Sequence, residues 1–284
     1  MQQESFAEKV IYRLIKKHMA GPTMNLAIKK AKQINDKGLP VSITFLSAAP
    51  SDRPKVNYVT NTYLQLAREI ARTGVRGSID VPLEQVGMSV SEEVAADSAS
   101  RIIEACRRYG IFAWIGIGDP PKELKVVRKI GFQKGVGLYF NSIRNLGQYV
   151  EKDDAAYPIK VACKINGEKK DEEKERVLSE ISKMLRKFRS LMLFSPSESV
   201  MAKLFSDAKN RKALIFEFQL GYSDKKLNRI VKRGARVSIS MPFGRDWVGY
   251  AINNVPEGYM RLLANTLLKE EKEEKEEGIK KKVG

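Results

Sequence analysis

The sequence is short of the side chains on which most metal and nucleophilic chemistry depends. Of its 284 residues, one is a histidine, His18, and two are cysteines, Cys106 and Cys163. A structural zinc or iron–sulfur site needs about four such ligands, and a catalytic triad needs a histidine beside its nucleophile. The sequence has almost no material for either kind of site, although the two cysteines could form one disulfide.

Long apolar runs are also missing. No stretch approaches the roughly 20 apolar residues that a membrane-spanning helix requires. The first residues, Met1-Gln2-Gln3-Glu4, lack the basic and apolar segments of a secretory signal. We therefore expect a cytoplasmic protein without a membrane span.

Acidic side chains are the third shortage. The chain carries 51 Lys and Arg against 34 Asp and Glu, a formal net charge of +17. A heat-adapted surface would explain many charges of both signs, but not this imbalance. A positive field of this size attracts polyanions, and nucleic acid is the commonest polyanion in a cell.

Three basic clusters at helical spacing concentrate this charge. Any one of them alone is typical of a solvated helix face, but three with few compensating acids indicate a basic rim that could contact phosphates. We therefore predict binding to RNA or to a ribonucleoprotein such as the ribosome. The candidate contacts, with the basic end of the chain, are Lys122, Lys125, Arg128, Lys129, Lys183, Arg186, Lys187, Lys225, Lys226, Arg229, Lys232, Arg233, Lys280, Lys281 and Lys282.

Eight short apolar runs alternate with helical patterns along most of the chain. The runs are mostly bounded by Gly, Pro or Ser, as expected for buried parallel strands. Eight strand–helix units in a chain of this length predict an α/β fold, a single (β/α)8 barrel of the TIM type. The predicted strands are 41–46, 76–81, 111–117, 135–140, 158–163, 189–194, 213–218 and 235–240.

The chain divides into three predicted regions. Residues 1–38 form N-terminal helices near 6–17 and 23–36, the second capped by Thr23 and ended near Gly38. Residues 39–268 form the barrel. Residues 269–284 are a charged tail whose regular Lys/Glu spacing favours a solvated helix with a basic end.

Periodicity also predicts which faces of the barrel helices are buried. On the first helix after the first strand, the predicted face is Tyr58, Thr62, Leu66 and Ile70. On the next helix it is Val94, Ala95, Ala99, Ile102, Ile103 and Cys106.

Four separated motifs give a more specific indication. They are His18-Met19-Ala20-Gly21-Pro22-Thr23 leading to Lys37-Gly38, then Gln85-Val86-Gly87-Met88, then Phe216-Glu217-Phe218-Gln219, and finally Phe243-Gly244 followed by Trp247 and Tyr250. In this order they resemble the proline dehydrogenase family over most of the chain. The resemblance implies a (β/α)8 fold, a flavin cofactor, FAD, and sites at the carboxyl ends of the strands.

The substrate positions of that family are largely replaced. The family's lysine after strand two falls on Pro82 or Asp80, and its Ile-Asp-x-Glu-Asp at strand three becomes Ile115-Gly116-Ile117-Gly118-Asp119. An Arg-Arg pair that grips the substrate carboxylate becomes Asn253-Asn254. The degenerate positions are thus Pro82, Gly116, Tyr250, Asn253, Asn254 and Glu257, of which Glu257 keeps the family's residue and is also typical of a helix first turn.

The flavin positions implied by the resemblance are altered too. Lys160 keeps a charge where the family has arginine, whereas Cys163 stands where the family has lysine and is expected to be a small core residue. Glu217 lies within a buried strand pattern, so we expect an arginine or lysine of the barrel to pair with it. The full set is Tyr139, Lys160, Cys163, Ser195 and Glu217.

These replacements decide the order of the functional hypotheses. Asparagine donates hydrogen bonds without charge, and removing one partner of a charge pair from a desolvated site costs roughly 2–5 kcal/mol. Our first hypothesis is a barrel that has lost catalysis, needs no cofactor and binds RNA or a ribonucleoprotein. The alternatives are an FAD-dependent proline dehydrogenase or related amine oxidoreductase, and a non-catalytic subunit of a larger dehydrogenase.

Overall fold

The computed structural model describes residues 15–131, 134–143, 146–150, 157–163, 170–188, 190–206 and 213–246. Eight parallel strands pair in sequence order and close on each other, because β8 also pairs with β1. The strands are β1 (Val41–Phe45), β2 (Gly77–Pro82), β3 (Phe112–Ile117), β4 (Val136–Phe140), β5 (Ile159–Ala162), β6 (Leu191–Phe194), β7 (Leu214–Gln219) and β8 (Arg236–Phe243). The predicted barrel is confirmed; the predicted strand ends lie within two residues of the observed ones, except that β8 runs three residues further.

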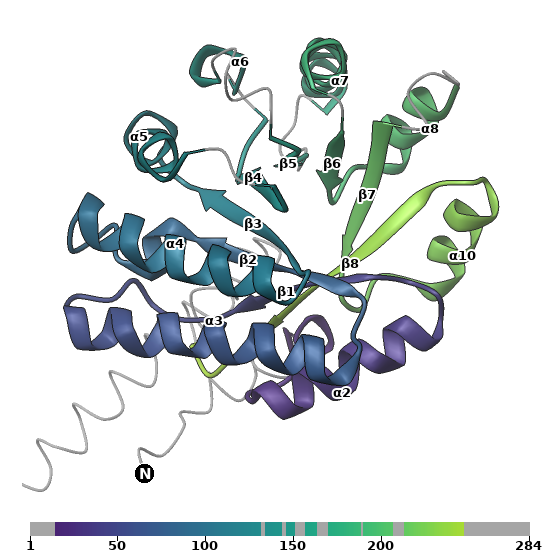
Figure 1. The fold of residues 1–284 in the computed structure, drawn as a ribbon. Helices are drawn as coiled ribbons and strands as arrows, with labels where there is room; N and C mark the ends of the chain where they lie inside the picture. The colour runs from purple at the N-terminus through teal and green to yellow at the C-terminus, as the bar shows by residue number, and fades with distance from the viewer. Residues whose placement is uncertain are drawn as a thin grey trace, which may run out of the picture.

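Helices surround the barrel as an outer layer (Figure 1). They are α2 (Met24–Asp36), α3 (Arg53–Thr73), α4 (Glu92–Arg108), α5 (Pro120–Ile130), α6 (Leu146–Tyr149), α7 (Lys170–Lys187), α8 (Glu198–Ser206) and α10 (Asp224–Lys232), with short 3-10 turns η1 (Lys16–His18) and η2 (Leu83–Val86). The helix α2 packs on β1, β8 and α3 and closes the ring between α10 and α3. Thr23 caps it as predicted, and Gly38 follows it with a φ of 85°.

The buried faces of α3 and α4 can be compared with the faces predicted from periodicity. The buried face of α4 is as predicted, except that Val94 is only half-buried and Ser98 joins it. On α3 the prediction was wrong by one position at its N-terminal half: Tyr58 is 66% exposed, and Val59 and Tyr63 are buried. Both choices keep the helical period, so the pattern alone could not separate them; in the folded chain α3 packs on α4 and η2, and the Tyr63 hydroxyl bonds to Gln85 of η2.

The N-terminal segment is tied to the carboxyl end of the barrel. His18 Nδ1 lies 2.7 Å from the carbonyl oxygen of Leu220, and the Ala20 amide donates to Pro242 O at 2.8 Å. The Gly244 amide donates to Gly21 O at 3.1 Å, with Gly244 at a φ of 138°. The His18 side chain and these two backbone hydrogen bonds therefore hold residues 18–21 against the carboxyl ends of β7 and β8.

Trp114 on β3 is buried inside the barrel, with its ring 5.9 Å from Lys160 Nζ. Gly137 on β4 makes room for this ring, since a Cβ there would lie 2.5 Å from it. Cys106 and Cys163 are buried free thiols, so no disulfide joins them. Within the described ranges, no helix is long and apolar enough to cross a membrane, and no cluster of His, Cys, Asp and Glu could hold a metal ion.

Candidate active site

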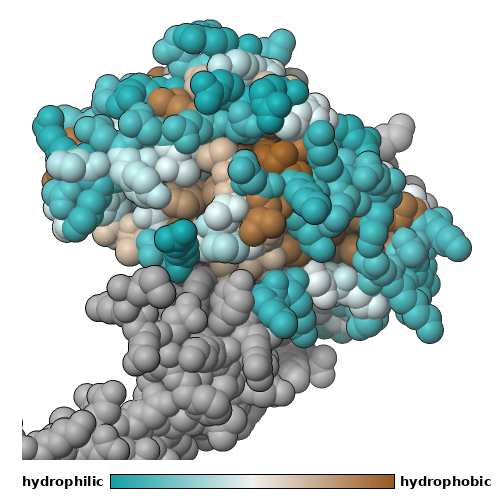
Figure 2. Space-filling model, turned by 90° about the horizontal axis from the view of Figure 1, so that it is seen from below, coloured by the Kyte–Doolittle hydropathy of each residue, from teal (hydrophilic) through white to brown (hydrophobic). Residues whose placement is uncertain are grey.

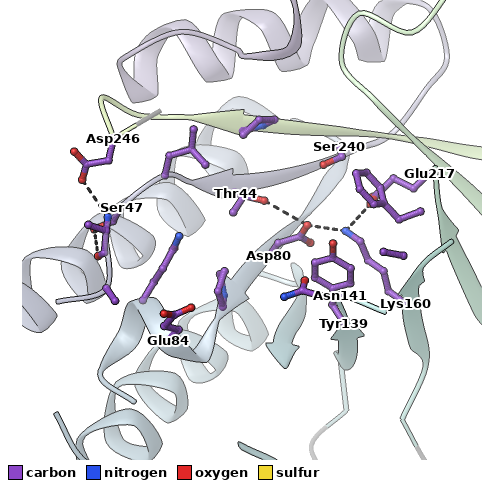
Figure 3. A pocket seen from close by; sticks show the side chains of 18 of the residues that line it. Thr44, Ser47, Asp80, Glu84, Tyr139, Asn141, Lys160, Glu217, Ser240 and Asp246 are labelled. Carbon is purple, nitrogen blue, oxygen red and sulfur yellow. Dashed lines mark hydrogen bonds and ion pairs between the residues drawn. The ribbon is translucent and has the colours of Figure 1, made fainter. Parts of the chain in front are cut away.

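A cavity of about 830 Å³ opens at the carboxyl ends of the strands (Figure 3). Ligands of (β/α)8 barrels bind at this end, and this volume is in the range of small-molecule and cofactor sites. Its lining residues are Thr44, Leu46, Ser47, Ala48, Ala49, Asp80, Pro82, Glu84, Gln85, Tyr139, Asn141, Lys160, Ala162, Phe194, Glu217, Ser240, Pro242, Arg245 and Asp246.

Three ionisable side chains form the floor of this cavity. Lys160 Nζ lies 2.6 Å from Asp80 Oδ2 and 2.6 Å from Glu217 Oε2, and all three side chains are almost completely buried. They come from β5, β2 and β7, and each occupies an inward position because side chains alternate along a strand. Strands far apart in the sequence thus bring the ammonium group of Lys160 and the carboxylates of Asp80 and Glu217 together inside the barrel.

Hydroxyl groups complete the floor. Ser42 Oγ donates to Asp80 Oδ1 at 2.6 Å, and Lys160 Nζ donates to Ser42 Oγ at 3.3 Å. Thr44 Oγ1 donates more weakly to Asp80 Oδ2, at 3.4 Å. An ammonium group has three hydrogens to donate. Asp80 and Ser42 accept hydrogen bonds from Lys160, and Glu217 Oε2 forms an ion pair with it, so the charge of Lys160 is balanced within the floor.

The surroundings determine the protonation of Lys160. Burial lowers its pKa, but the adjacent Asp80 and Glu217 carboxylates outweigh burial and raise the pKa above its ordinary value. The Tyr139 ring lies 4.7 Å from Lys160 Nζ and the Trp114 ring 5.9 Å, and both favour a cation. Lys160 is therefore a fixed positive charge and not an amine nucleophile.

Glu217 has the opposite character. Burial raises its pKa to about 7; the Lys160 charge opposes this and the Asp80 charge adds to it. Its Oε2 makes the close ion pair with Lys160, but neither oxygen has hydrogen-bond geometry with any described residue. Within the part of the chain that the structure describes, Oε1 is thus a buried acceptor without a hydrogen-bond partner, and the raised pKa of Glu217 lies close to neutral pH.

The five flavin positions divide into two groups. Tyr139, Lys160 and Glu217 line the cavity. Cys163 is fully buried with its Sγ near Val161 O, as expected for a core residue, and does not line it. Ser195 also lies off the cavity wall; it has a φ of 51° and donates its amide to Glu217 O at 2.9 Å.

The substrate positions are only partly described. Pro82 lines the cavity, and Gly116 is its register partner on β3. A Cβ at Gly116 would lie 3.0 Å from Pro82 Cα, so a larger residue would have to displace the neighbouring strand. The backbone of β2 at position 82 therefore favours glycine at position 116. Trp247, Tyr250, Asn253, Asn254 and Glu257 lie outside the described residues.

The sequence predicted the pairing of Glu217 on the cavity floor but not the other residues of the floor. The expected basic partner of Glu217 is confirmed as Lys160. The role of Asp80, and of Ser42 and Thr44 beside it, was missed, although polar residues at alternate positions of otherwise apolar strands are a detectable signal. Asp119, the acid retained at strand three, is exposed just before α5 and does not line the cavity.

The basic clusters lie on the outer helices. Their members on α5, α7 and α10 are exposed, and α6 and α8 separate these three helices in the ring (Figure 1). Hydrophilic side chains cover much of the molecule seen from below, with smaller hydrophobic areas between them (Figure 2). Several cluster residues pair with acids: Lys129 with Glu92 and Glu93, Lys183 with Glu180, and Lys226 with Glu198. Lys280, Lys281 and Lys282 lie outside the described residues.

The fold and the cavity together define a (β/α)8 barrel with a ligand-sized site at the carboxyl ends of its strands. No protein-family model matches the chain. Proline dehydrogenase 1 of Bacillus subtilis (strain 168) is 21% identical over 267 residues, which cover 85% of this chain and 86% of that protein. Proline dehydrogenase of Deinococcus radiodurans is 21% identical over 288 residues and covers 90% of each.

Solved structures give the same result for the fold. Proline utilization A (PutA) from Bdellovibrio bacteriovorus, inactivated by N-propargylglycine, matches with a TM-score of 0.74 at 13% identity over 86% of this chain. The match covers 32% of that PutA chain, so the present chain corresponds to about a third of its length. The chain therefore resembles the proline dehydrogenase family in sequence and in fold.

The cavity can be compared with the FAD that this resemblance implies. Its volume and its flat or apolar walls, which include Tyr139, Phe194, Pro82 and Pro242, fit a planar, mostly apolar ring system. At the rim, Arg245 is accompanied by the carboxylates of Glu84 and Asp246, so the described residues fit the ring but provide no cationic cradle for the diphosphate.

Proposed function

We propose that this chain is a flavin-dependent oxidoreductase of the proline dehydrogenase type that acts on a small amine. The observation that carries the proposal is the cavity at the carboxyl end of the barrel, with Lys160 and Glu217 on its floor. The similar proteins named proline dehydrogenase supply the reaction class. We place the enzyme above the non-catalytic barrel, because the similar curated proteins are proline dehydrogenases and the cavity retains ionisable groups on its floor.

The residues of the floor have separable roles in such a reaction. Bound flavin would supply the two-electron acceptor for a hydride from the carbon next to the amine nitrogen. An amine must lose its ammonium proton before that transfer, and Glu217, with a pKa near 7, is a suitable base for that proton. Lys160 positions Glu217 by the 2.6 Å ion pair, and Asp80 holds Lys160 in place from the opposite side.

An absorbance spectrum of the natively purified protein is the first test. Flavin gives a band near ~450 nm, and an amine substrate added without oxygen should bleach it. Proline is the first substrate to try, because the similar proteins carry its name. A protein without bound flavin that also fails to take up added FAD would contradict the proposal.

The net charge of +17 supports a second candidate function, binding to RNA or a ribonucleoprotein such as the ribosome. Phosphate contacts of this kind weaken as counterions compete, so affinity should fall steeply with salt. Filter binding to a structured RNA at several salt concentrations measures this. A lack of binding at low salt, or an affinity that does not change with salt, would remove this candidate.

Co-purification with other subunits would instead favour a non-catalytic part of a larger dehydrogenase.

A further inference from the structure

The cavity has a local charge opposite to that of the whole chain. The chain has a formal charge of +17, yet four of the described cavity residues are acids, Asp80, Glu84, Glu217 and Asp246. Only two, Lys160 and Arg245, are bases. In a chain so rich in Lys and Arg, this excess of acid is a property of the site.

The floor of the cavity lacks one positive charge. Lys160 neutralises one of the two buried carboxylates, so ionised Asp80 and ionised Glu217 together leave the floor one unit negative. A buried charge without a partner is costly, and it recruits either a proton or a cation. Glu217 lines the cavity, and its fully buried Oε1 has no hydrogen-bond partner among the described residues.

The same floor opposes an anionic ligand. The charge of the Lys160 ammonium is already matched by two carboxylates at 2.6 Å, Asp80 and Glu217, so the floor has no spare positive charge for a substrate carboxylate. Arg245 is the other base among the described lining residues, and it shares the rim with Glu84 and Asp246. Aromatic rings of Tyr139 and Phe194 line the wall next to the floor, and their faces favour cations.

We infer that the cavity binds the cation of an amine that carries no carboxylate group, with the ammonium held at Glu217 Oε1. The inference rests on the proposed function for the reaction, but not for the binding. It predicts that removing the carboxylate from a cyclic amino acid improves the ligand, whereas a site built for a zwitterion would show the reverse order.

Isothermal titration calorimetry with the full chain tests this binding directly. The probes are proline and pyrrolidine, which differ only by the carboxylate, at equal salt and at about pH 8, where Glu217 is mostly ionised. Pyrrolidine should bind roughly tenfold or more tightly than proline, because proline adds an unpaired anion to an acidic cavity. Equal affinities, or tighter binding of proline, would overturn the inference.

Glu217→Gln identifies the group that holds the cation. It should weaken pyrrolidine binding roughly tenfold or more, since it removes a buried charge partner. The matched control is Glu175→Gln, which removes a surface charge paired with Lys203 and should leave the affinity unchanged. Thermal melting of both variants verifies that they fold. An unchanged pyrrolidine affinity in Glu217→Gln, with the fold intact, would overturn the inference.

A proton count gives an independent readout. The charged groups that face Glu217 are Lys160 of β5 and Asp80 of β2, and Tyr139 of β4 lies beside Lys160; the register partners of Glu217 on β6 and β8 are Phe194 and Ser238. Since Glu217 is partly protonated below its pKa of about 7, binding of a cation near pH 6 should release protons. Titrations in two buffers of different ionisation enthalpy measure the release, which should vanish in Glu217→Gln; release that persists there would contradict the assignment.

These experiments separate the inference from the proposed function. If flavin is absent but pyrrolidine binds through Glu217, the function fails and the inference stands. If flavin is present and proline bleaches it while pyrrolidine neither binds nor bleaches it, the function stands and the inference fails.

Discussion

The charges on the barrel floor and those on its outer helices involve the same residue types but have different physical consequences. Lys160 is 1% exposed and touches two carboxylates at 2.6 Å, whereas Lys226 on α10 touches Glu198 at the same distance with its side chain 51% exposed. Water screens the outer pair and leaves it little net energy. Lys160, Asp80 and Glu217 cannot exchange one another for water. Their burial therefore determines the geometry of the floor, the protonation of its side chains and the ligand that it can accept.

The largest difference in stability between the floor and the outer helices is expected when the buried cation is removed. Lys160→Met leaves the carboxylates of Asp80 and Glu217 buried without their cation, so we expect a loss of about 3–5 kcal/mol in the free energy of unfolding. Urea denaturation followed by circular dichroism measures it.

A compensating variant serves as the control for this change. Adding Asp80→Asn and Glu217→Gln to Lys160→Met removes the unpaired charges and should recover most of the lost stability, because an apolar or neutral floor does not need the cation. A single variant Lys160→Met as stable as the parent chain would show that the floor carries no such coupling.

The second effect is the pH dependence of stability. Glu217 has a folded-state pKa raised from 4.5 to about 7, so between these values the folded chain binds more protons than the unfolded chain. This group therefore makes stability fall as pH rises from about 4.5 to about 7, by at most about 1.4 kcal/mol per pH unit, and contributes no further change above that. The difference in unfolding free energy between the parent chain and Glu217→Gln, followed over this range, isolates the effect; parallel curves would contradict it.

A third test concerns the close packing beside the cavity. A Cβ at Gly116 would lie 3.0 Å from Pro82 Cα, whereas one at Gly118 meets its nearest atom at 3.8 Å. Gly116→Ala should therefore lose about 1–3 kcal/mol by overpacking. Gly118→Ala is the matched control and should lose no stability. Chemical denaturation of the two variants side by side compares them, and equal stabilities would contradict the crowding.

The smallest effect is expected on the outer ring. Lys226→Ala removes the ion pair with Glu198, and Lys129→Ala removes contacts with Glu92 and Glu93. Because these side chains are exposed, the midpoint of urea unfolding should not change measurably. A clear shift of the midpoint in either variant would mean that these exposed ion pairs stabilise the fold, contrary to the difference drawn between them and the buried floor.

The fold could be predicted from the sequence because its signal is local and repeated. Eight apolar runs separated by helical periods specify strand–helix units one at a time, and eight parallel units close into a barrel. The face of α3 could be predicted only in part, because Tyr58 and Val59 both satisfy its period and only the contacts of the folded chain distinguish them.

The site could be predicted only where a motif marked it. The Phe-Glu-Phe-Gln motif drew attention to Glu217, and a buried carboxylate required a basic partner. The identity of the other members depended on register: Lys160, Asp80 and Ser42 are separated by up to 118 positions in the chain and meet only through strands β5, β2 and β1. The flavin positions Cys163 and Ser195 resemble the others in sequence, but they do not line the cavity.

The sequence by itself determined the barrel, the excess of positive charge and the residue types available for chemistry, because composition and periodicity act residue by residue. Only the tertiary structure decided how those charges are distributed. It placed the lysines of α5, α7 and α10 in water and enclosed one lysine between two carboxylates, because inward positions of a closed barrel exclude solvent and force distant side chains into contact. The same enclosure left Oε1 of Glu217 without a hydrogen-bond partner among the described residues, and that oxygen is the basis of our proposal for the ligand.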